Sequence, residues 1–330
     1  MVNAVNGSLG PMGGSVGDGP SWPAITFAIP YFDNLAYLLE AIDSVRAQTR
    51  QDWQLVIVDD AGPEPVDEVL SGLNDARIHW FRNESNLGLA GNWNRCIHLA
   101  EAEWVTLLHA DDRLHPDYAH TVLEAAACDP ELGAIFTDSE IINANGEPAR
   151  SLPDAVKRLA RRPAGNHDVI GDADLAAILS NNYVFCPAIC YRTEVARAHP
   201  FDTRWRMVMD LEHTAQMLLK GHRLYAIRRP LYQYRRHAGN QTTALTSTSV
   251  RFREEITLYR ELAATASIQG WTRSARAADR RWMVRAHLAL QALLDIGARR
   301  WSSGYDKTRV LTSDLTVRTR QRLAQRFRLR

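Results

Sequence analysis

The chain has 330 residues, of which 45% are hydrophobic and 23% are charged, and its formal net charge at pH 7 is +1. These values are typical of a globular protein with one large domain and an appendage, or with two domains. A net charge so close to zero argues against a dedicated nucleic-acid-binding protein. The charge is uneven, however, because residues 246–330 carry 18 Lys and Arg against 7 Asp and Glu.

The first 22 residues are rich in Gly, Ser and Pro, which predicts a disordered leader over residues 1–22. They lack the basic and apolar regions of a signal peptide, and no apolar run in the chain approaches about 18 residues, so we expect no membrane span. The four cysteines show no CxxC spacing, which favours a reducing, cytoplasmic compartment. Two of them are interpreted as small core residues, namely Cys186 and Cys190.

From residue 24 onward the pattern alternates between strands and helices. Strands are predicted at 24–30, 53–62, 76–83 and 104–112, and helices at 35–49 and 91–102. Strands that alternate with helices predict an α/β fold with a mainly parallel sheet that is covered on both faces. In open sheets of this kind, ligands bind beyond the carboxyl ends of the strands.

Acidic residues follow three of these strands. Since the carboxyl ends of parallel strands meet at one edge, we expect these residues to share one rim with an aromatic residue, as Tyr31, Asp33, Asp59, Asp60, Asp111 and Asp112. Carboxylates gathered in this way repel one another unless a cation or hydroxyl donors lie between them. The sequence therefore predicts a site for a metal ion and a nucleotide. For any one Asp, the competing interpretation is a turn or a helix cap.

Two stretches carry a resemblance to a known family. The segment "AIPYFDNLAYLLEAIDSVRAQTRQDWQLVIVDDAG" and the later "NESNLGLAGNWNRCIHLAEAEWVTLLHADDRLHPD" resemble the nucleotide-binding half of the inverting family 2 glycosyltransferases with the GT-A fold. The segment "MVMDLEHTAQMLLKGHRLYAIRRPLYQYRRHAGNQTT" is similar to their acceptor half. The resemblance spans residues 24–243 and implies a sugar transferase that uses a nucleotide-activated donor, with uridine diphosphate as the expected nucleotide.

The resemblance also implies roles for individual residues. Pro30 and Tyr31 are expected beside the nucleotide base, with Tyr31 stacked on it, and the remaining nucleotide contacts are expected from Asp33, Asp60, Asn86, Asn94 and Asp111. Asn86 and Asn94 have an equally good alternative as turn and helix-packing residues.

Metal binding is implied by the segment that contains Asp111 and Asp112. These two acids match the family's DXD-type motif, although His109 stands where the family often has a first acid. The sequence favours Asp112 as the direct ligand of Mg²⁺ or Mn²⁺, with Asp111 beside it. His237, in "YRRH", is expected near the phosphates or the metal, and a satisfied surface histidine is the alternative.

The general base is expected at Asp210. It matches the second acid of the family's "ED" pair, where Met209 replaces the first acid. A cap of the following helix is the alternative for Asp210, and Glu212 is the reserve candidate for the base.

Three further predictions concern organisation and specificity. The expected domains are the leader, a catalytic domain at 23–245 with halves at 23–117 and 118–245, and a basic helical region at 246–330. Residues 142–169 are the expected specificity segment, and residues 238–243 a mobile lid. The basic end around 315–327 either lies on an anionic membrane at its inner face or packs on the acidic catalytic domain.

The acceptor is left open among a glycan, a lipid-linked saccharide and a small molecule. Two alternative functions also remain. One is a catalytically silent carbohydrate- or membrane-binding subunit, which His109 and Met209 make conceivable. The other is a sugar-nucleotide pyrophosphorylase, although the Gly-rich, basic loop that such an enzyme needs near its first strand is absent from "IPYFDN".

Overall fold

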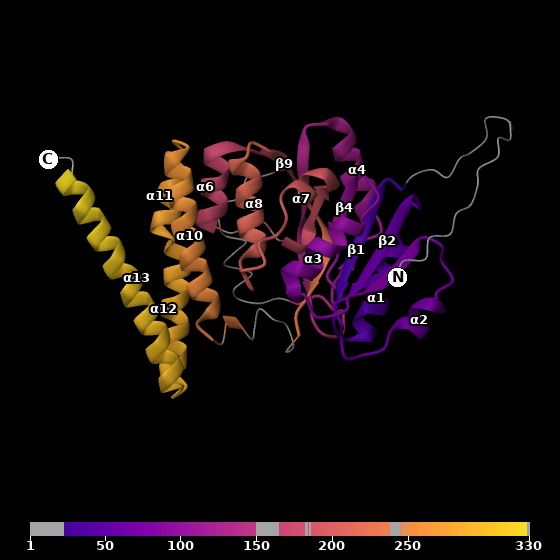
Figure 1. The fold of residues 1–330 in the computed structure, drawn as a ribbon, viewed down its shortest axis with the longest axis horizontal. Helices are drawn as coiled ribbons and strands as arrows, with labels where there is room; N and C mark the ends of the chain where they lie inside the picture. The colour runs from indigo at the N-terminus through magenta and orange to yellow at the C-terminus, as the bar shows by residue number, and fades with distance from the viewer. Residues whose placement is uncertain are drawn as a thin grey trace, which may run out of the picture.

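The computed structural model describes residues 23–149, 165–181, 184, 186–237, 245–246 and 248–328, with the backbone alone for 186 and 317–328. Its centre is a nine-stranded sheet with the order β3-β2-β1-β4-β8-β6-β9-β5, and β7 pairs with β9. Helices cover both faces of the sheet, and a group of helices extends from one end (Figure 1). The predicted α/β class is confirmed, but the sheet is mixed rather than mainly parallel, because four of its described strand pairings are parallel and four are antiparallel.

The first half of the sheet is formed by parallel strands that alternate with helices. In chain order these elements are β1 (Ile25–Tyr31), α1 (Leu35–Arg46), β2 (Trp53–Asp59), α2 (Asp67–Ser71), β3 (Ile78–Arg82), α3 (Gly88–Leu99) and β4 (Trp104–Leu107). Strand β1 pairs with β2 and β4 in parallel, and β2 pairs with β3 in parallel. Since the strands run in one direction, the residues after β1, β2 and β4 reach the same rim.

Alternate side chains of these strands enter two different core layers, because successive side chains of a strand point to opposite faces. Ala28, Val56 and Leu107 pack with the layer that contains α3. Phe27 and Ile57 pack with the layer that contains α1. Both faces of the sheet are therefore shielded from water by helices, which explains why the strands are nearly continuous apolar runs.

The second half of the sheet is mixed. It contains β5 (Arg113–Leu114), α4 (Tyr118–Cys128), β6 (Leu132–Ile142), β7 (His167–Val169), α6 (Gly171–Asn181), the 3₁₀ turn η1 (Cys186–Ala188), β8 (Ile189–Arg192), α7 (Thr193–Ala198), α8 (Met209–Leu219) and β9 (Arg223–Arg235). Strand β8 is antiparallel to β4 and β6, whereas β6 and β9 are parallel. The long β9 also pairs with β5, so the end of β9 lies beside the segment that follows β4.

The C-terminal region is helical, as predicted, with α10 (Val250–Ile268), α11 (Thr272–Arg280), α12 (Trp282–Gly297) and α13 (Trp301–Arg328). These helices stand at the end of the molecule opposite β2 and α2 (Figure 1). Phe252, Ile256, Leu288 and Val310 belong to the same core cluster as the α3 layer of the sheet. The C-terminal helices are therefore packed on the sheet region through a shared core.

Some predictions fall outside the described residues. These are the leader at 1–22, the lid at 238–243, residues 150–164 of the specificity segment and the side chain of Cys186. Cys190 is buried, which confirms its assignment to the core. The basic side chains after residue 316 are not described, so the choice between membrane contact and packing stays open for that end. None of the described helices combines the length and apolar content needed to cross a bilayer.

A buried charge cluster joins the C-terminal helices. The Asp314 carboxylate is 1% exposed and pairs with Arg281 and Arg285, each at 2.7 Å, and with Arg260 at 2.8 Å. Asp314→Ala is therefore expected to lower the free energy of unfolding by about 3–5 kcal/mol, because Arg281 would remain buried without a counter-charge.

Chemical denaturation of the wild type and of Asp314→Ala measures this difference in the free energy of unfolding. Asp306→Ala is the matched control, since its pair with Arg253 is exposed at both partners, and its effect should stay below about 1 kcal/mol. Equal effects of the two substitutions would show that the buried cluster does not hold the helices together.

Candidate active site

The predicted rim exists, and the acids on it divide into buried and open groups. Asp59, Asp60 and Asp112 are each at most 4% exposed, whereas Asp33 is exposed and Asp111 is half-buried. Asp59 pairs with Arg82 and accepts a hydrogen bond from the Gly62 amide. The open carboxylates of the rim are therefore Asp33 and Asp111.

Asp60 holds the loop that leads into α3. One carboxylate oxygen accepts hydrogen bonds from the Asn83 amide group and the Leu87 backbone, both at 2.8 Å, and the other accepts from the Gly88 backbone at 3.0 Å. The Gly88 amide also donates to the Asn86 side chain at 2.8 Å, and Gly88 has a φ of 74° that favours glycine. Asp60 and Asn86 thus shape the loop at this rim.

Asn94 is used for packing between the two halves. Its side-chain amide donates to the Phe201 carbonyl at 2.9 Å and accepts from the Phe201 backbone at 2.8 Å. This pair of bonds ties α3 to the segment before α8. Of the two interpretations drawn from the sequence, the structure agrees with helix packing for Asn94.

Tyr31 requires a correction. Its side chain is fully buried in the α1 core layer, and its hydroxyl donates to Glu64 at 2.9 Å. Burial and the Glu64 carboxylate raise the pKa of the Tyr31 phenol, so it stays neutral. A ring enclosed on both faces cannot stack on a base, so the predicted stacking is wrong for Tyr31 in this arrangement. The neighbouring Phe32 is 45% exposed, and Pro30 is partly exposed.

Asp112 is held inside the protein by β9. The Tyr232 hydroxyl donates to one of its oxygens at 2.8 Å, and the Arg235 backbone amide donates to the other at 2.7 Å. The side chain is 0% exposed, and burial together with the charge of Asp111 raises its pKa well above the usual value. Asp112 is thus a buried acid whose negative charge a nearby cation would stabilise.

Asp111 is the acid of the pair that reaches the surface. Its carboxylate lies 3.1 Å from Nε2 of His237, and its backbone carbonyl accepts a hydrogen bond from Arg235 at 2.7 Å. Arg235 is fully buried and also pairs with Glu40, so it fixes the loop after β4. Of the two adjacent acids, Asp111 is therefore the more exposed one.

The residues around this loop fit a divalent cation. His109, Asp111 and Asp112 each offer a donor atom, and these atoms lie within 4.8 Å of one another. The His109 ring is largely buried, which lowers its pKa, and its Nε2 has no hydrogen-bond partner among the described residues. A neutral imidazole with an unused nitrogen beside two carboxylates is a suitable ligand set for a transition-type ion such as Mn²⁺.

Asp210 lies in the first turn of α8, where it accepts a hydrogen bond from the Leu211 backbone at 2.7 Å. It is half-buried, whereas Glu212 is 9% exposed. Burial raises the pKa of Glu212, and the charges nearest to it belong to Asp202, Arg204 and Lys220. The two acids therefore face different surroundings, and the assignment of the base to Asp210, with Glu212 in reserve, stays a prediction.

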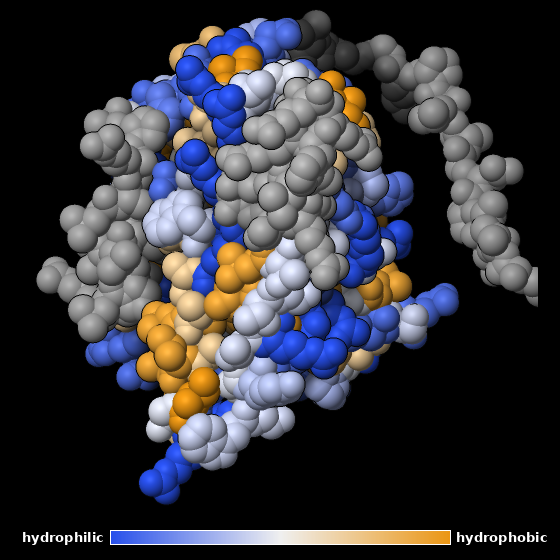
Figure 2. Space-filling view, turned by 90° about the vertical axis from the view of Figure 1, so that its left-hand side faces the viewer, coloured by the Kyte–Doolittle hydropathy of each residue, from blue (hydrophilic) through white to orange (hydrophobic). Residues whose placement is uncertain are grey.

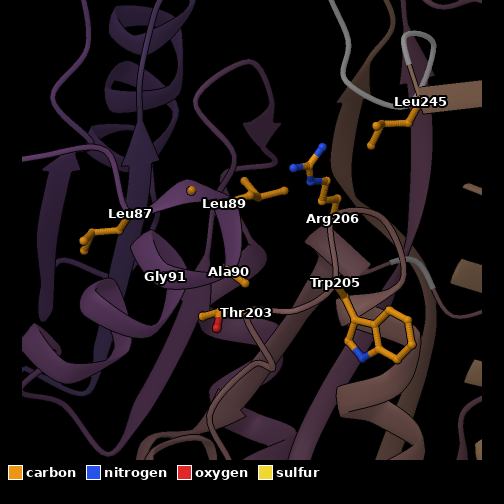
Figure 3. Close-up of a pocket in the computed structure, with 9 residues that line it drawn as sticks. Leu87, Leu89, Ala90, Gly91, Thr203, Trp205, Arg206 and Leu245 are labelled. Carbon is orange, nitrogen blue, oxygen red and sulfur yellow. The ribbon is translucent and has the colours of Figure 1, made fainter. Parts of the chain in front are cut away.

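A pocket of about 390 Å³ separates the start of α3 from the segment before α8 (Figure 3). In that view Arg206 reaches between Leu89 and Leu245. The Trp205 indole nitrogen is buried without a hydrogen-bond partner among the described residues. The pocket is thus mainly apolar with polar groups from Trp205 and Arg206, and its lining residues are Leu87, Gly88, Leu89, Ala90, Gly91, Thr203, Trp205, Arg206 and Leu245.

Sequence reasoning missed the residues that support the acids. Tyr232 and Arg235 contact the Asp111–Asp112 loop from 120 or more positions away, and Trp205 and Arg206 line the pocket. Tyr232 and Arg235 lie in the stretch "LYQYRRH", which was quoted for its resemblance.

The sequence of this chain is similar to those of known glycosyltransferases. Residues 26–173 match the model of the family described as glycosyl transferase family 2. The chain is 26% identical over 164 residues to the succinoglycan biosynthesis protein ExoO of Rhizobium meliloti, covering 49% of this chain and 44% of that protein. It is 27% identical over 237 residues to an uncharacterised glycosyltransferase of Nostoc, covering 68% and 69%. The first three curated relatives are each covered over less than half of their length.

Solved structures with a similar fold include two that hold a nucleotide sugar. TarS of S. aureus, residues 1–349 in complex with UDP-GlcNAc, has a TM-score of 0.57 at 16% identity, covering 88% of this chain and 90% of that one. The mannosyltransferase PcManGT of Pyrobaculum calidifontis, in complex with GDP-Man and Mn²⁺, has a TM-score of 0.56 at 15% identity, covering 92% and 88%. Residues 26–173 therefore resemble glycosyl transferase family 2, and the chain has the same fold as these two solved structures.

Proposed function

We propose that this protein transfers a sugar from a nucleoside-diphospho-sugar to an acceptor hydroxyl, with inversion at the anomeric carbon and with help from a divalent metal. The observation that carries the proposal is the group of His109, Asp111 and Asp112 at the rim of a family 2 domain, fixed there by Tyr232 and Arg235. Asp111 and His109 are the residues we expect to hold the metal, with Asp112 behind them.

The chemistry explains why these groups are needed. Mg²⁺ or Mn²⁺ bound there would supply positive charge beside the diphosphate leaving group. His237, which lies 3.1 Å from Asp111, is placed to contact the same phosphates. Arg235 and Tyr232 hold the acids in fixed positions, so the site is preorganised before the donor binds.

Asp210 is proposed to take the proton of the acceptor hydroxyl as this oxygen attacks the anomeric carbon. Its place at the start of α8 is next to the segment that lines the pocket. We therefore propose that the acceptor enters through this pocket, where the Arg206 guanidinium reaches between Leu89 and Leu245 and can donate hydrogen bonds. The relatives' names point to polysaccharide assembly, so a glycan or lipid-linked acceptor is preferred over a small molecule.

Uridine diphosphate is the expected nucleotide, and the choice is testable because the two structural neighbours are bound to different donors, UDP-GlcNAc and GDP-Man. We also propose a cytoplasmic location with peripheral membrane contact through the basic end at 315–327. The positive charge of that segment supports the membrane contact.

Calorimetric titration of the purified chain with uridine, guanosine and thymidine diphosphates, each with Mn²⁺ and then with excess chelator, tests the proposed function. We expect one nucleotide to bind, with Mn²⁺ raising its affinity by roughly tenfold or more. Binding that is unchanged by the chelator would contradict the metal role. Absence of binding for all three nucleotides would instead favour the catalytically silent subunit.

A further inference from the structure

The hairpin of α12 and α13 exposes large apolar side chains to solvent. Figure 2 faces this end of the molecule and shows apolar surface gathered in the lower part of the view. Leu293 is 67% exposed, Trp301 63% and Tyr305 72%. We call this surface the hairpin face, and it consists of Trp282, Leu290, Leu293, Leu294, Ile296, Trp301 and Tyr305.

These residues recur at helical spacing. Trp282, Leu290 and Leu293 are separated by eight and three positions along α12, and Leu290 and Leu294 by four, so they share one side of the helix. Trp301 and Tyr305 are four positions apart at the start of α13. The hairpin face is therefore a continuous stripe, whereas scattered single apolar residues would need no explanation.

The same hairpin buries charged groups on its inner side. Asp295 is 2% exposed and pairs with Lys307, which is 1% exposed. Asp295 also pairs with Arg300 at 2.5 Å. Burying ions while leaving leucines in water is the reverse of the usual pattern for a helix on a protein surface. An apolar partner on the outside would remove the exposed leucines of the hairpin face from water, as is usual for leucine side chains.

Basic side chains are also exposed on the C-terminal helices and the turn between α12 and α13. Arg276, Arg299 and Arg309 are exposed, and none of them forms an ion pair with a described residue. They belong to the segment 246–330, which contains 18 Lys and Arg residues and only 7 Asp and Glu residues. Aromatic residues at the ends of an apolar stripe, with arginines around it, are typical of helices that lie in a membrane interface.

We propose that the hairpin face inserts into the headgroup region of a bilayer that contains anionic lipids. The leucines enter the boundary between headgroups and acyl chains, and the arginines contact the anionic headgroups. A second copy of the chain fits this face less well, because a symmetric contact would bring two strongly basic segments together.

The test measures binding of the full chain to vesicles by co-sedimentation, without nucleotide or acceptor, so its result is independent of the transfer reaction. Vesicles of phosphatidylcholine alone are compared with vesicles that contain about 30% phosphatidylglycerol. We expect binding to the anionic vesicles, and we expect the triple variant Leu290→Gln, Leu293→Gln, Leu294→Gln to weaken it roughly tenfold or more. Glutamine keeps the helix propensity, and each replaced side chain is more than half exposed, so the fold is retained.

A matched control replaces exposed apolar residues at the opposite end of the molecule. Val69→Gln with Phe81→Gln changes side chains on α2 and β3, which are 36% and 39% exposed, and should leave vesicle binding unchanged. A second variant, Arg276→Gln with Arg299→Gln and Arg309→Gln, should weaken binding to anionic vesicles and reduce its dependence on salt.

Three results would overturn the proposal. The first is a wild-type chain that stays in the supernatant with both vesicle types. The second is a triple leucine variant that binds as tightly as the wild type. The third is a wild-type chain that sediments as a dimer without vesicles while the triple variant sediments as a monomer, since a second copy would then cover the hairpin face.

Discussion

Replacing Asp210 by Asn is expected to lower the turnover number by about two orders of magnitude or more, while the affinity for the nucleoside diphosphate stays near that of the wild type. A general base contributes roughly 10²–10⁴-fold to a reaction of this kind, and an amide cannot accept the proton. Asn still accepts a hydrogen bond in the first turn of α8, so the Leu211 contact survives. Initial-rate kinetics and calorimetry with the same nucleotide measure the two quantities.

Glu212→Gln is the control for this experiment. Glu212 lies two positions further along α8, is nearly buried and faces Asp202, Arg204 and Lys220. Its replacement should change turnover by no more than about threefold, because its side chain does not share the surroundings of Asp210. If Glu212→Gln abolished turnover and Asp210→Asn did not, the base would be Glu212.

Asp111→Asn is expected to remove most of the metal-dependent binding of the nucleotide, by roughly a hundredfold. Loss of a residue that only hydrogen-bonds to a metal ligand already weakens metal binding by about 10–100-fold. Asp111 is proposed as a ligand itself, so its loss should have an effect at least as large. The Arg235 contact to the Asp111 carbonyl does not involve the carboxylate, so the loop should stay in place. Titration of nucleotide with and without Mn²⁺, followed by thermal denaturation, separates lost binding from lost stability.

Two further variants make this result interpretable. Asp33→Asn changes the other open acid of the rim and should leave the effect of Mn²⁺ intact. Asp112→Asn should affect stability as well as binding, because Tyr232 and the Arg235 amide both donate to that carboxylate. A normal Mn²⁺ response in Asp111→Asn, together with its loss in Asp112→Asn at unchanged stability, would restore Asp112 as the direct ligand.

The strands, helices and rim of the catalytic half were predictable from the sequence for local reasons. Period-two and period-3.6 patterns depend on neighbouring residues, and parallel strands connected by helices must end at a common rim. The acids after β1, β2 and β4 were therefore found without coordinates. The helical character of residues 246–330 was also predicted from the sequence, and α10 to α13 lie in that region.

The exposure of each rim residue was decided by the tertiary structure. Asp111 and Asp112 are adjacent in sequence and chemically identical, yet β9 covers Asp112 and leaves Asp111 at the surface. Tyr31 is enclosed because Glu64 and the α1 layer pack over it. Burial depends on segments far along the chain, and no local pattern near a residue specifies which distant segment will cover it.

The hairpin face illustrates the same division. The sequence by itself determined that α12 and α13 are helices with apolar residues at regular spacing, because propensity and periodicity act within a few positions. The sequence pattern did not determine which side of each helix would face the core. The tertiary structure turned Asp295 and Lys307 inward, where they pair, and left Leu293 and Trp301 in contact with solvent. An ion pair between residues on different helices can form only after the hairpin has closed, so that choice belongs to the folded chain.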